Sequence, residues 1–330
     1  MERFYRRIQI LIISALTGLV FTAAGAAVCF ASESGAEAVP EKQERSTCRY
    51  AVFCADLSDS YNSVLTEEMR LRIMEKGDEA VILDADLSNN RQNSQIRNTL
   101  AGGIDGIFIQ PVNPRGIVTV LREAGEAGVP VIGIDIEPTD LSCLDSFCGT
   151  DYLQAGKMLA ESLTELLPEG GEVLILSRGN DDRFQSTADG LTDGLYGSTY
   201  RQIEIVECKL SREDAKKAVA EKLEEETDLK VIAAGSDVMA LGALDALREA
   251  ENETIRVISV GGSPEMKQEI AGGEDRIIGT AVLSPVAIAD AAVGIMNAGI
   301  EGQRLKSRYP VETFLMTSEN VGNYGLDSWQ

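Results

Sequence analysis

The stretch Ala233-Ala234-Gly235-Ser236-Asp237-Val238-Met239-Ala240-Leu241-Gly242-Ala243-Leu244-Asp245-Ala246-Leu247 predicts the end of a buried strand, a short polar turn and a helix. Gly235 turns the chain, and Ser236 or Asp237 can cap the helix by accepting hydrogen bonds from its free N–H groups. In open α/β sheets, ligands bind outside the carboxyl ends of the strands, and this turn follows such an end. The same unit recurs along the chain, and this repetition predicts the fold class.

Apolar runs alternate with helical patterns over most of the sequence. We expect strands at 50–56, 79–84, 106–110, 129–135, 146–150, 172–177, 202–208, 230–234, 256–260 and 277–282, with an extended segment at 309–316. We expect further helices at 64–76, 89–101, 113–127, 152–167, 186–196, 212–226, 264–271 and 286–299. Strands of this length between helices indicate parallel sheets wound in right-handed βαβ units, and their number fits two sheets better than one. We therefore predict an α/β protein with two doubly wound parallel-sheet lobes.

The composition favours a binding protein over an enzyme or a nucleic-acid-binding protein. The formal charge of −23 argues against nucleic acid as a partner. The chain has no histidine, so the commonest general base and metal ligand are both absent. No nucleotide-binding glycine motif follows an expected strand. We expect no catalytic residues, no cofactor and no metal site.

Residues 1–31 are expected to be a targeting segment. Arg3, Arg6 and Arg7 precede a mostly apolar, uncharged run at 8–28, and small residues stand before Ser32. A cleaved signal peptide, an uncleaved membrane anchor and a lipid anchor through a cysteine remain open as alternatives. Each of them places the folded part outside the cytoplasm, at the periplasm or the cell surface. Residues 32–47 are expected to be a flexible linker.

An extracytoplasmic location permits disulfide bonds. Cys48 and Cys54 lie six residues apart along one expected strand, which is too far for a bond between them. Cys143 and Cys148 flank a short loop, and the sequence leaves open whether they pair. We expect most of the cysteines to act as small buried hydrophobic residues.

Several segments, taken in order, resemble the ribose-type periplasmic sugar-binding proteins, which have the type I periplasmic-binding fold. The segments are Gly106-Ile-Phe-Ile-Gln-Pro, Val129-Pro-Val-Ile-x-Ile-Asp135 and Ser236-Asp237-x-Met-Ala-Leu-Gly-Ala-Leu. Lactose-repressor-type regulators share the fold, but they carry a helix-turn-helix where this chain has its targeting segment. The resemblance implies an N-terminal lobe of 48–150 plus 284–310 and a C-terminal lobe of 151–283 plus 311–330. It also implies a three-strand hinge and a ligand held between the lobes.

Polar turns after the strands supply the candidate ligand-binding residues. They are Asp59, Ser60, Tyr61, Asn62, Gln110, Asp135 and Glu137 in the first lobe, and Asp151, Asn180, Arg183, Gln185, Ser236, Asp237, Gly261 and Ser263 in the second. The resemblance makes Asp135 a sugar-binding aspartate and Tyr61 an aromatic ring that stacks on the sugar. Asp151, Ser236 and Asp237 have an alternative interpretation as simple helix caps.

The chain departs from the family at several of these positions. Asn62 stands where a second aromatic ring is usual, Ile136 replaces an arginine, and Gly261-Gly262-Ser263 holds no carboxylate. The sequence therefore does not identify the ligand. We expect an exported protein that captures a small polar molecule, a sugar or a polyol, and delivers it to an ABC permease. The alternative is a membrane-anchored sensor that signals to a receptor kinase or a chemoreceptor.

Overall fold

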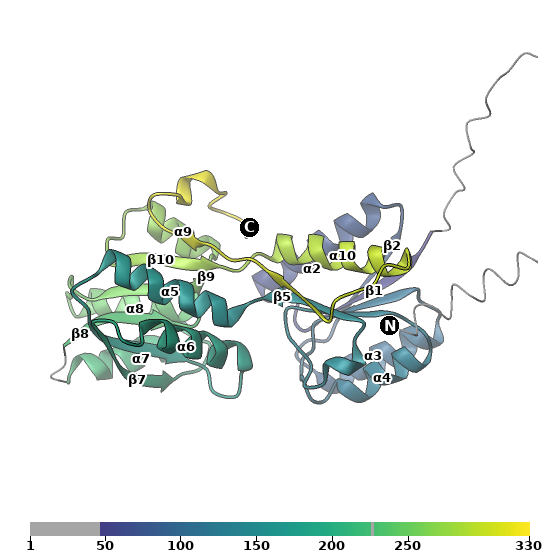
Figure 1. Ribbon diagram of the computed structural model, residues 1–330, viewed down its shortest axis with the longest axis horizontal. Coiled ribbons are helices and arrows are strands. Elements are labelled where there is room, and N and C mark those ends of the chain that lie inside the picture. Colours follow the sequence, from purple (N-terminus) through teal and green to yellow (C-terminus); the bar gives the residue numbers. More distant parts are fainter. Residues whose placement is uncertain (1–46, 226–227) are drawn as a thin grey trace, which may run out of the picture.

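The computed structural model describes residues 47–225 and 228–330, which form two lobes side by side (Figure 1). The expected targeting segment at 1–31 and residues 32–46 of the expected linker lie outside the described residues. Each lobe is built around one six-stranded sheet within the described part of the chain. The strand orders are β11-β5-β4-β3-β1-β2 and β12-β10-β9-β8-β6-β7, and the strands pair in parallel except for β10 with β12. The predicted fold class is confirmed.

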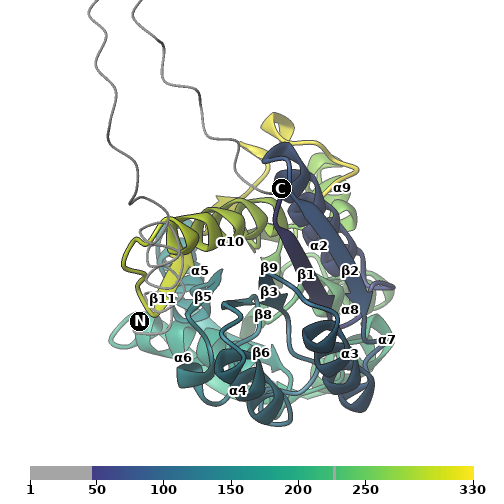
Figure 2. The ribbon, with the colours of Figure 1, turned by 90° about the vertical axis from the view of Figure 1, so that its right-hand side faces the viewer.

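The first lobe, called the N-lobe, is built mainly from the first hundred described residues and is completed by a later return of the chain. Its elements are β1 (Arg49–Cys54), α2 (Ser60–Glu75), β2 (Glu79–Asp84), α3 (Asn89–Ala101), β3 (Gly106–Ile109), α4 (Val118–Glu126), β4 (Val131–Ile134), β5 (Ser146–Thr150), α10 (Pro285–Ile300) and β11 (Arg308–Val311). Helices α2 and α10 cover one face of the sheet, and α3 and α4 cover the other (Figure 2). Side chains alternate along each strand, so Val52 and Phe53 belong to the cores on opposite faces.

The second lobe, called the C-lobe, repeats the plan. Its elements are α5 (Tyr152–Leu166), β6 (Gly171–Ser177), α6 (Asp182–Leu195), β7 (Tyr200–Glu207), α7 (Arg212–Leu223), β8 (Leu229–Ala234), α8 (Asp237–Glu249), β9 (Arg256–Gly261), α9 (Pro264–Ala271), β10 (Ile277–Val282) and β12 (Leu315–Met316). Helices α5 and α6 pack so closely that a Cβ added to Gly156 would lie 2.1 Å from the backbone oxygen of Thr187. The small residues at this contact therefore allow the two helices to approach.

Several expected element boundaries were wrong, and local hydrogen bonds explain the differences. Helix α2 begins at Ser60 rather than at residue 64, because the Asp59 side chain accepts a hydrogen bond from the N–H of Asn62. In the same way Asp181 caps α6, which begins four residues earlier than expected. Helix α4 begins at Val118 rather than at residue 113. The side chain of Asn113 instead stabilises a turn by accepting hydrogen bonds from the N–H groups of Arg115 and Gly116.

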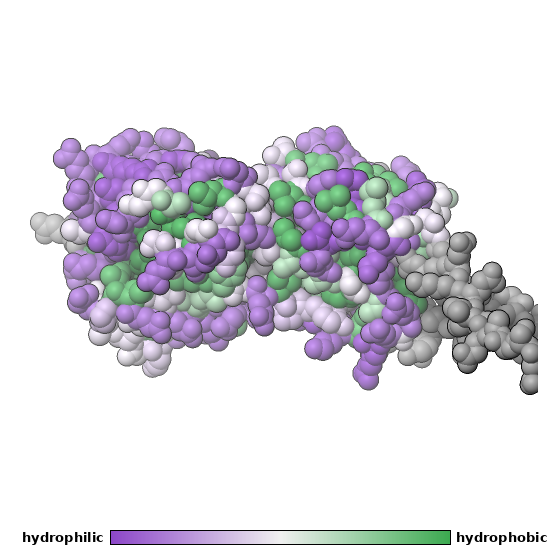
Figure 3. Space-filling view, turned by 90° about the horizontal axis from the view of Figure 1, so that it is seen from above, coloured by the Kyte–Doolittle hydropathy of each residue, from purple (hydrophilic) through white to green (hydrophobic). Residues whose placement is uncertain are grey.

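The extended segment expected at 309–316 is two strands in two different sheets. Strand β11 pairs with β5 in the N-lobe, and β12 pairs with β10 in the C-lobe. The chain therefore passes from the N-lobe to the C-lobe in the segment that joins β11 to β12. It also crosses from one lobe to the other after β5 and after β10. Seen from above, the two lobes are separated by a notch (Figure 3).

The five cysteines in the described residues are all free thiols. Cys143 and Cys148 therefore do not pair, which answers the question that the sequence left open. The Cys143 thiol donates to the backbone oxygen of Asp140, 2.9 Å away. Burial raises the pKa of the Cys148 thiol to about 12. The predicted interpretation as small hydrophobic residues is confirmed for Cys54, Cys143 and Cys148, which are buried.

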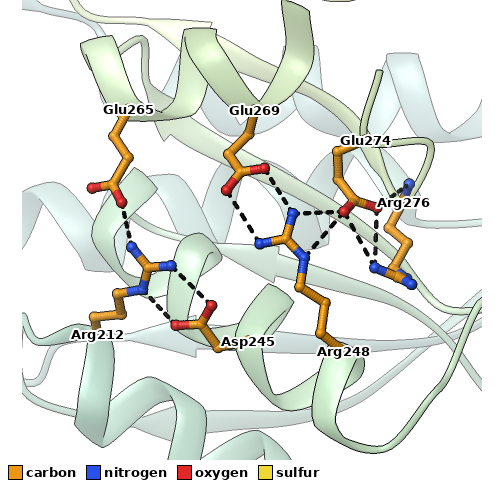
Figure 4. A network of polar contacts seen from close by, with 7 residues as sticks. All are labelled: Arg212, Asp245, Arg248, Glu265, Glu269, Glu274 and Arg276. Carbon is orange, nitrogen blue, oxygen red and sulfur yellow. Dashed lines mark hydrogen bonds and ion pairs between the residues drawn. The ribbon is translucent and has the colours of Figure 1, made fainter. Parts of the chain in front are cut away.

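A network of ion pairs, called the C-lobe ion network, crosses the outer side of α7, α8 and α9 (Figure 4). It consists of Arg212 with Asp245 and Glu265, Arg248 with Glu269 and Glu274, and Arg276 with Glu274. Its members lie on three helices and on the loop before β10, so it ties these elements together at the surface. Among the described residues, no helix has both the length and the apolar character that a membrane span requires.

Candidate functional site

Four polar side chains meet at the carboxyl ends of the N-lobe strands. Tyr61 and Asn62 lie in the first turn of α2, Gln110 follows β3, and Asp135 follows β4. The Nε2 group of Gln110 donates to Asn62 Oδ1 at 2.7 Å and to Asp135 Oδ2 at 2.9 Å. The Tyr61 hydroxyl donates to the other oxygen of Asp135 at 3.4 Å. These four residues are called the N-lobe polar cluster.

Asp135 is the centre of the N-lobe polar cluster. It is 4% exposed, and its φ of 59° lies in the left-handed region. Aspartate is among the few non-glycine residues that tolerate this region, but such backbone geometry still costs about 1–3 kcal/mol. A buried carboxylate with strained backbone is kept only where surrounding contacts hold it in place. This observation makes Asp135 the strongest candidate for a functional residue in the described chain.

The C-lobe places an arginine opposite this cluster. Arg183 lies in the first turn of α6, and its guanidinium donates to both oxygens of Asp181 at 3.1 and 3.0 Å. Its Nη1 also reaches Oδ2 of Asp135 in the other lobe, at 3.5 Å. Tyr152, the first residue of α5, lies beside Arg183, whose guanidinium interacts favourably with the tyrosine oxygen. The two lobes are thus in polar contact at this site.

Burial and charge perturb the titratable groups of the site. Burial disfavours the charged form of Arg183, but Tyr152, Asp135 and Asp181 together raise its pKa well above the usual value. Burial also acts against ionisation of Asp181, yet its hydrogen bonds with Arg183 lower the pKa of this carboxyl. Burial and the nearby Asp135 raise the pKa of Tyr61 well above its usual value. Burial and the same Asp135 also raise the pKa of Tyr152. Both tyrosines therefore stay protonated and can donate hydrogen bonds at neutral pH.

The site combines acceptors, donors and an aromatic ring at the polar contact between the lobes. A carboxylate can accept two hydroxyl hydrogen bonds, and the side-chain amides can donate as well as accept. The charge of Arg183 is already balanced by Asp181 and Asp135. The arrangement therefore suits a small ligand with several hydroxyl groups.

Asp237 does not belong to this arrangement, although the sequence predicted it as a ligand-binding residue. One carboxylate oxygen accepts from the hydroxyls of Ser259 at 2.6 Å and Thr280 at 2.8 Å, and the other accepts from the N–H of Ser263 at 2.6 Å. A Cβ on Gly261 would lie 2.4 Å from the same carboxylate. Asp237, 4% exposed, therefore ties together the ends of β9 and β10 inside the C-lobe.

Other candidates from the sequence also have local roles. Asp59, Asp151, Ser236 and Ser263 cap helices α2, α5, α8 and α9 with their side chains. Glu137 forms a bidentate ion pair with Arg308 at 2.7 Å, away from the polar cluster.

Three further candidates have no contact with the polar cluster among the described interactions. Gln185 donates to Asp189 along the exposed side of α6 at 2.8 Å. Asn180 is exposed, with a φ of 61°, in the turn before α6. Ser60 accepts a hydrogen bond from the side chain of Trp329 instead.

Three residues at or beside the site were not among the ligand-binding residues expected from the sequence. Asp181 and Tyr152 both contact Arg183, and their positions directly before or at the start of a helix after a strand are a signal that would have found them. Trp329 packs against Tyr61 with the ring centroids 5.2 Å apart. Its place near the end of the chain, beyond the last expected strand, carried no pattern that pointed to the site.

Comparison with known proteins finds relatives that cover most of the chain. The ribose import binding protein RbsB of Salmonella typhimurium is 20% identical over 240 residues, which cover 72% of this chain and 80% of the relative. The D-apiose import binding protein of Paraburkholderia graminis is 24% identical over 257 residues, which cover 76% of this chain and 81% of the relative.

Solved structures show the same fold. An ABC transporter solute binding protein from Mycobacterium smegmatis with bound glycerol has a TM-score of 0.76 at 24% identity, covering 86% of this chain and all 100% of the other. One from Bacillus halodurans with bound myo-inositol has a TM-score of 0.76 at 19% identity, covering 86% and 99%. The model of the periplasmic binding protein domain matches residues 50–304. The chain therefore belongs to the periplasmic binding protein family.

Proposed function

We propose that this protein captures a neutral sugar or polyol between its lobes, with Asp135 as the principal acceptor for ligand hydroxyls. The observation that carries the proposal is the N-lobe polar cluster, in which a strained, buried carboxylate meets two amides and a tyrosine. Family membership makes the chain a binding protein rather than an enzyme.

The charges of the site favour a neutral ligand over an anion. Arg183 already pairs with Asp181 and Asp135, so an anionic ligand would have to compete with two carboxylates for one guanidinium. The relatives support the same class. Their names describe import of ribose and of D-apiose, and the solved structures hold glycerol and myo-inositol. All four molecules are neutral and carry several hydroxyl groups.

Capture would depend on movement of the lobes about the chain crossings near Thr150, Leu283 and Pro310. The N-lobe of 48–150 plus 284–310 and the C-lobe of 151–283 plus 311–330 would act as rigid bodies, and the crossings would absorb the rotation. The closed form would then deliver the ligand to an ABC permease, with no role for nucleic acid. Family membership implies an extracytoplasmic location. Export through residues 1–31, with or without their removal, is tested by the mass of the mature native protein.

Isothermal titration calorimetry against D-ribose, L-arabinose, D-allose and myo-inositol tests the proposal. We expect at least one of them to bind, and Asp135→Asn to weaken that binding tenfold or more, because hydrogen bonds to a charged group contribute about 1.5–3 kcal/mol. Glu123→Gln is the matched control, since it removes a carboxylate from the outer side of the same lobe, where Glu123 pairs with Arg97.

Two results would contradict this assignment. Unchanged affinity in Asp135→Asn would remove Asp135 from the binding site. Binding of an anionic sugar phosphate in preference to the neutral sugars would show that Arg183 sets the ligand class. Thermal unfolding of both variants, measured in parallel, separates lost binding from lost folding.

A further inference from the structure

The last residues of the chain lie between the two lobes. After β12 the chain passes over α9 of the C-lobe, and its end lies close to the start of α2 and α10 in the N-lobe (Figure 1). Residues 324–330 are called the C-terminal segment. They were not part of the expected ligand site, and the family match ends before them, at residue 304.

One end of the C-terminal segment is fixed to the C-lobe by a buried lysine. Lys267 in α9 is 0% exposed, and its ammonium group donates to the backbone oxygens of Gly325 and Ser328. Gln268, the next residue of α9, donates to the Asp327 side chain at 3.1 Å. A fully buried lysine is rare unless its donors are satisfied, so these contacts hold the segment firmly in place. The segment therefore moves with the C-lobe.

The other end of the segment touches the N-lobe. The indole N–H of Trp329 donates to Ser60 Oγ at 3.2 Å. Its ring meets the ring of Tyr61 edge to face, at 5.2 Å and 85°. The backbone oxygen of Gln330 accepts from the Ser284 hydroxyl at 2.6 Å, at the start of α10. Seven residues thus join α9 of one lobe to two helices of the other.

The contact with Tyr61 connects the segment to the ligand site. The Tyr61 hydroxyl donates to Asp135, while Trp329 packs against the same ring. Opening of the hinge would carry Ser60 and Tyr61 away from a segment that is anchored to Lys267. The Trp329 contacts therefore belong to the arrangement of the lobes seen here, in which Arg183 also reaches Asp135, and they oppose opening of the hinge.

We propose that the C-terminal segment is a latch that holds the two lobes closed, and that Trp329 positions Tyr61 in the ligand site from the opposite lobe. The proposal adds a regulatory element to the proposed binding function, on which it rests. Loss of the latch lowers the proportion of closed molecules in the absence of ligand. It also frees the Tyr61 ring, whose orientation then no longer depends on the C-lobe.

Small-angle X-ray scattering of the ligand-free protein tests the latch without knowledge of the ligand. In Trp329→Ala we expect the closed-to-open ratio to fall about tenfold, equivalent to ~1.4 kcal/mol, with a larger radius of gyration. Trp329→Phe keeps an aromatic edge, so its closed-to-open ratio should lie between those of the wild type and Trp329→Ala. Tyr196→Ala is the matched control, because Tyr196 is an aromatic residue of the C-lobe that is 93% exposed. Scattering from Trp329→Ala that superimposes on the wild type would overturn the proposal.

Fluorescence gives a second test, because Trp329 is the one tryptophan in the sequence. Ser60→Ala removes a hydroxyl from the N-lobe and leaves the Asp59 cap of α2 intact. We expect the Trp329 emission to shift to the red and acrylamide to quench it more strongly in this variant. Unchanged emission and quenching would show that Trp329 does not lie against the N-lobe. Both tests use ligand-free protein, so failure of every sugar to bind would contradict the proposed function and leave the latch result standing.

Discussion

The buried Asp237 allows a sharp test of the structural role that we assign to it. Its carboxylate accepts three hydrogen bonds, from Ser259, Thr280 and the N–H of Ser263. At about 1.5–3 kcal/mol for each bond to a charged group, their sum is an upper limit of roughly 5–9 kcal/mol. In Asp237→Ala the two hydroxyls can rotate toward backbone oxygens, but the N–H of Ser263 cannot. We therefore expect a loss of about 3–5 kcal/mol in the free energy of unfolding.

Asp237→Asn should lower the free energy of unfolding by a smaller amount, about 1–3 kcal/mol. Its amide oxygen keeps both hydroxyl donors, and only the contact with Ser263 is lost. Urea unfolding followed by circular dichroism measures both variants. With a slope of about 2 kcal/mol per molar urea, Asp237→Ala should lower the midpoint of the C-lobe transition by roughly 2 M. An unchanged midpoint, together with lost sugar binding, would refute our reasoning and return Asp237 to the ligand site.

Three further outcomes are expected. Gly156→Ala should destabilise the C-lobe by about 1–3 kcal/mol, because the added methyl group forces α5 and α6 apart. Gly294 lies in α10 with open space around it, so Gly294→Ala should stabilise the protein by about 0.5–1 kcal/mol in the same urea assay. The hydrogen bond from Arg212 holds the pKa of Asp245 below its usual 3.8. Thermal stability should therefore be constant above pH 5 and fall as the pH drops below about 4, and this fall should be smaller in Asp245→Asn. Burial raises the pKa of Cys143 to about 11 and of Cys148 to about 12, so a thiol reagent at pH 8 should modify neither in the folded protein and both in urea without reductant. A melting point independent of pH between 5 and 3, or rapid thiol labelling of the native protein, would contradict these two expectations.

The candidate site was predictable only as far as it follows strand ends. Gln110 and Asp135 come directly after buried strands, so their place at one edge of the N-lobe sheet followed from the sequence pattern. Arg183 was expected on the opposite lobe for the same reason, and the structure brings it to 3.5 Å from Asp135. The strand-end rule does not say which way a side chain points. Glu137 satisfies the rule as well as Asp135 does, yet it turns to Arg308.

The first residues of the helices were also difficult to predict, because a polar residue after a strand can have more than one role. Asp59 and Asp181 each follow a strand by a few residues, where a ligand contact and an N-terminal cap are equally consistent with the residue type. The choice depends on where the first free N–H groups lie in three dimensions. Ser236 and Asp237 show the same ambiguity, because the serine caps α8 and the aspartate binds neighbouring strands.

The sequence by itself determined the two wound sheets, because the alternation of buried strands and amphipathic helices is local and repeats along the chain. It also determined the sheet edge at which Asp135 lies. Only the tertiary structure decided that Asp237 is enclosed by hydroxyls from β9 and β10, and that Trp329 reaches Tyr61 across the lobes. Both contacts join residues that are distant in sequence, and the free energy of such contacts depends on how the whole chain packs rather than on any local pattern.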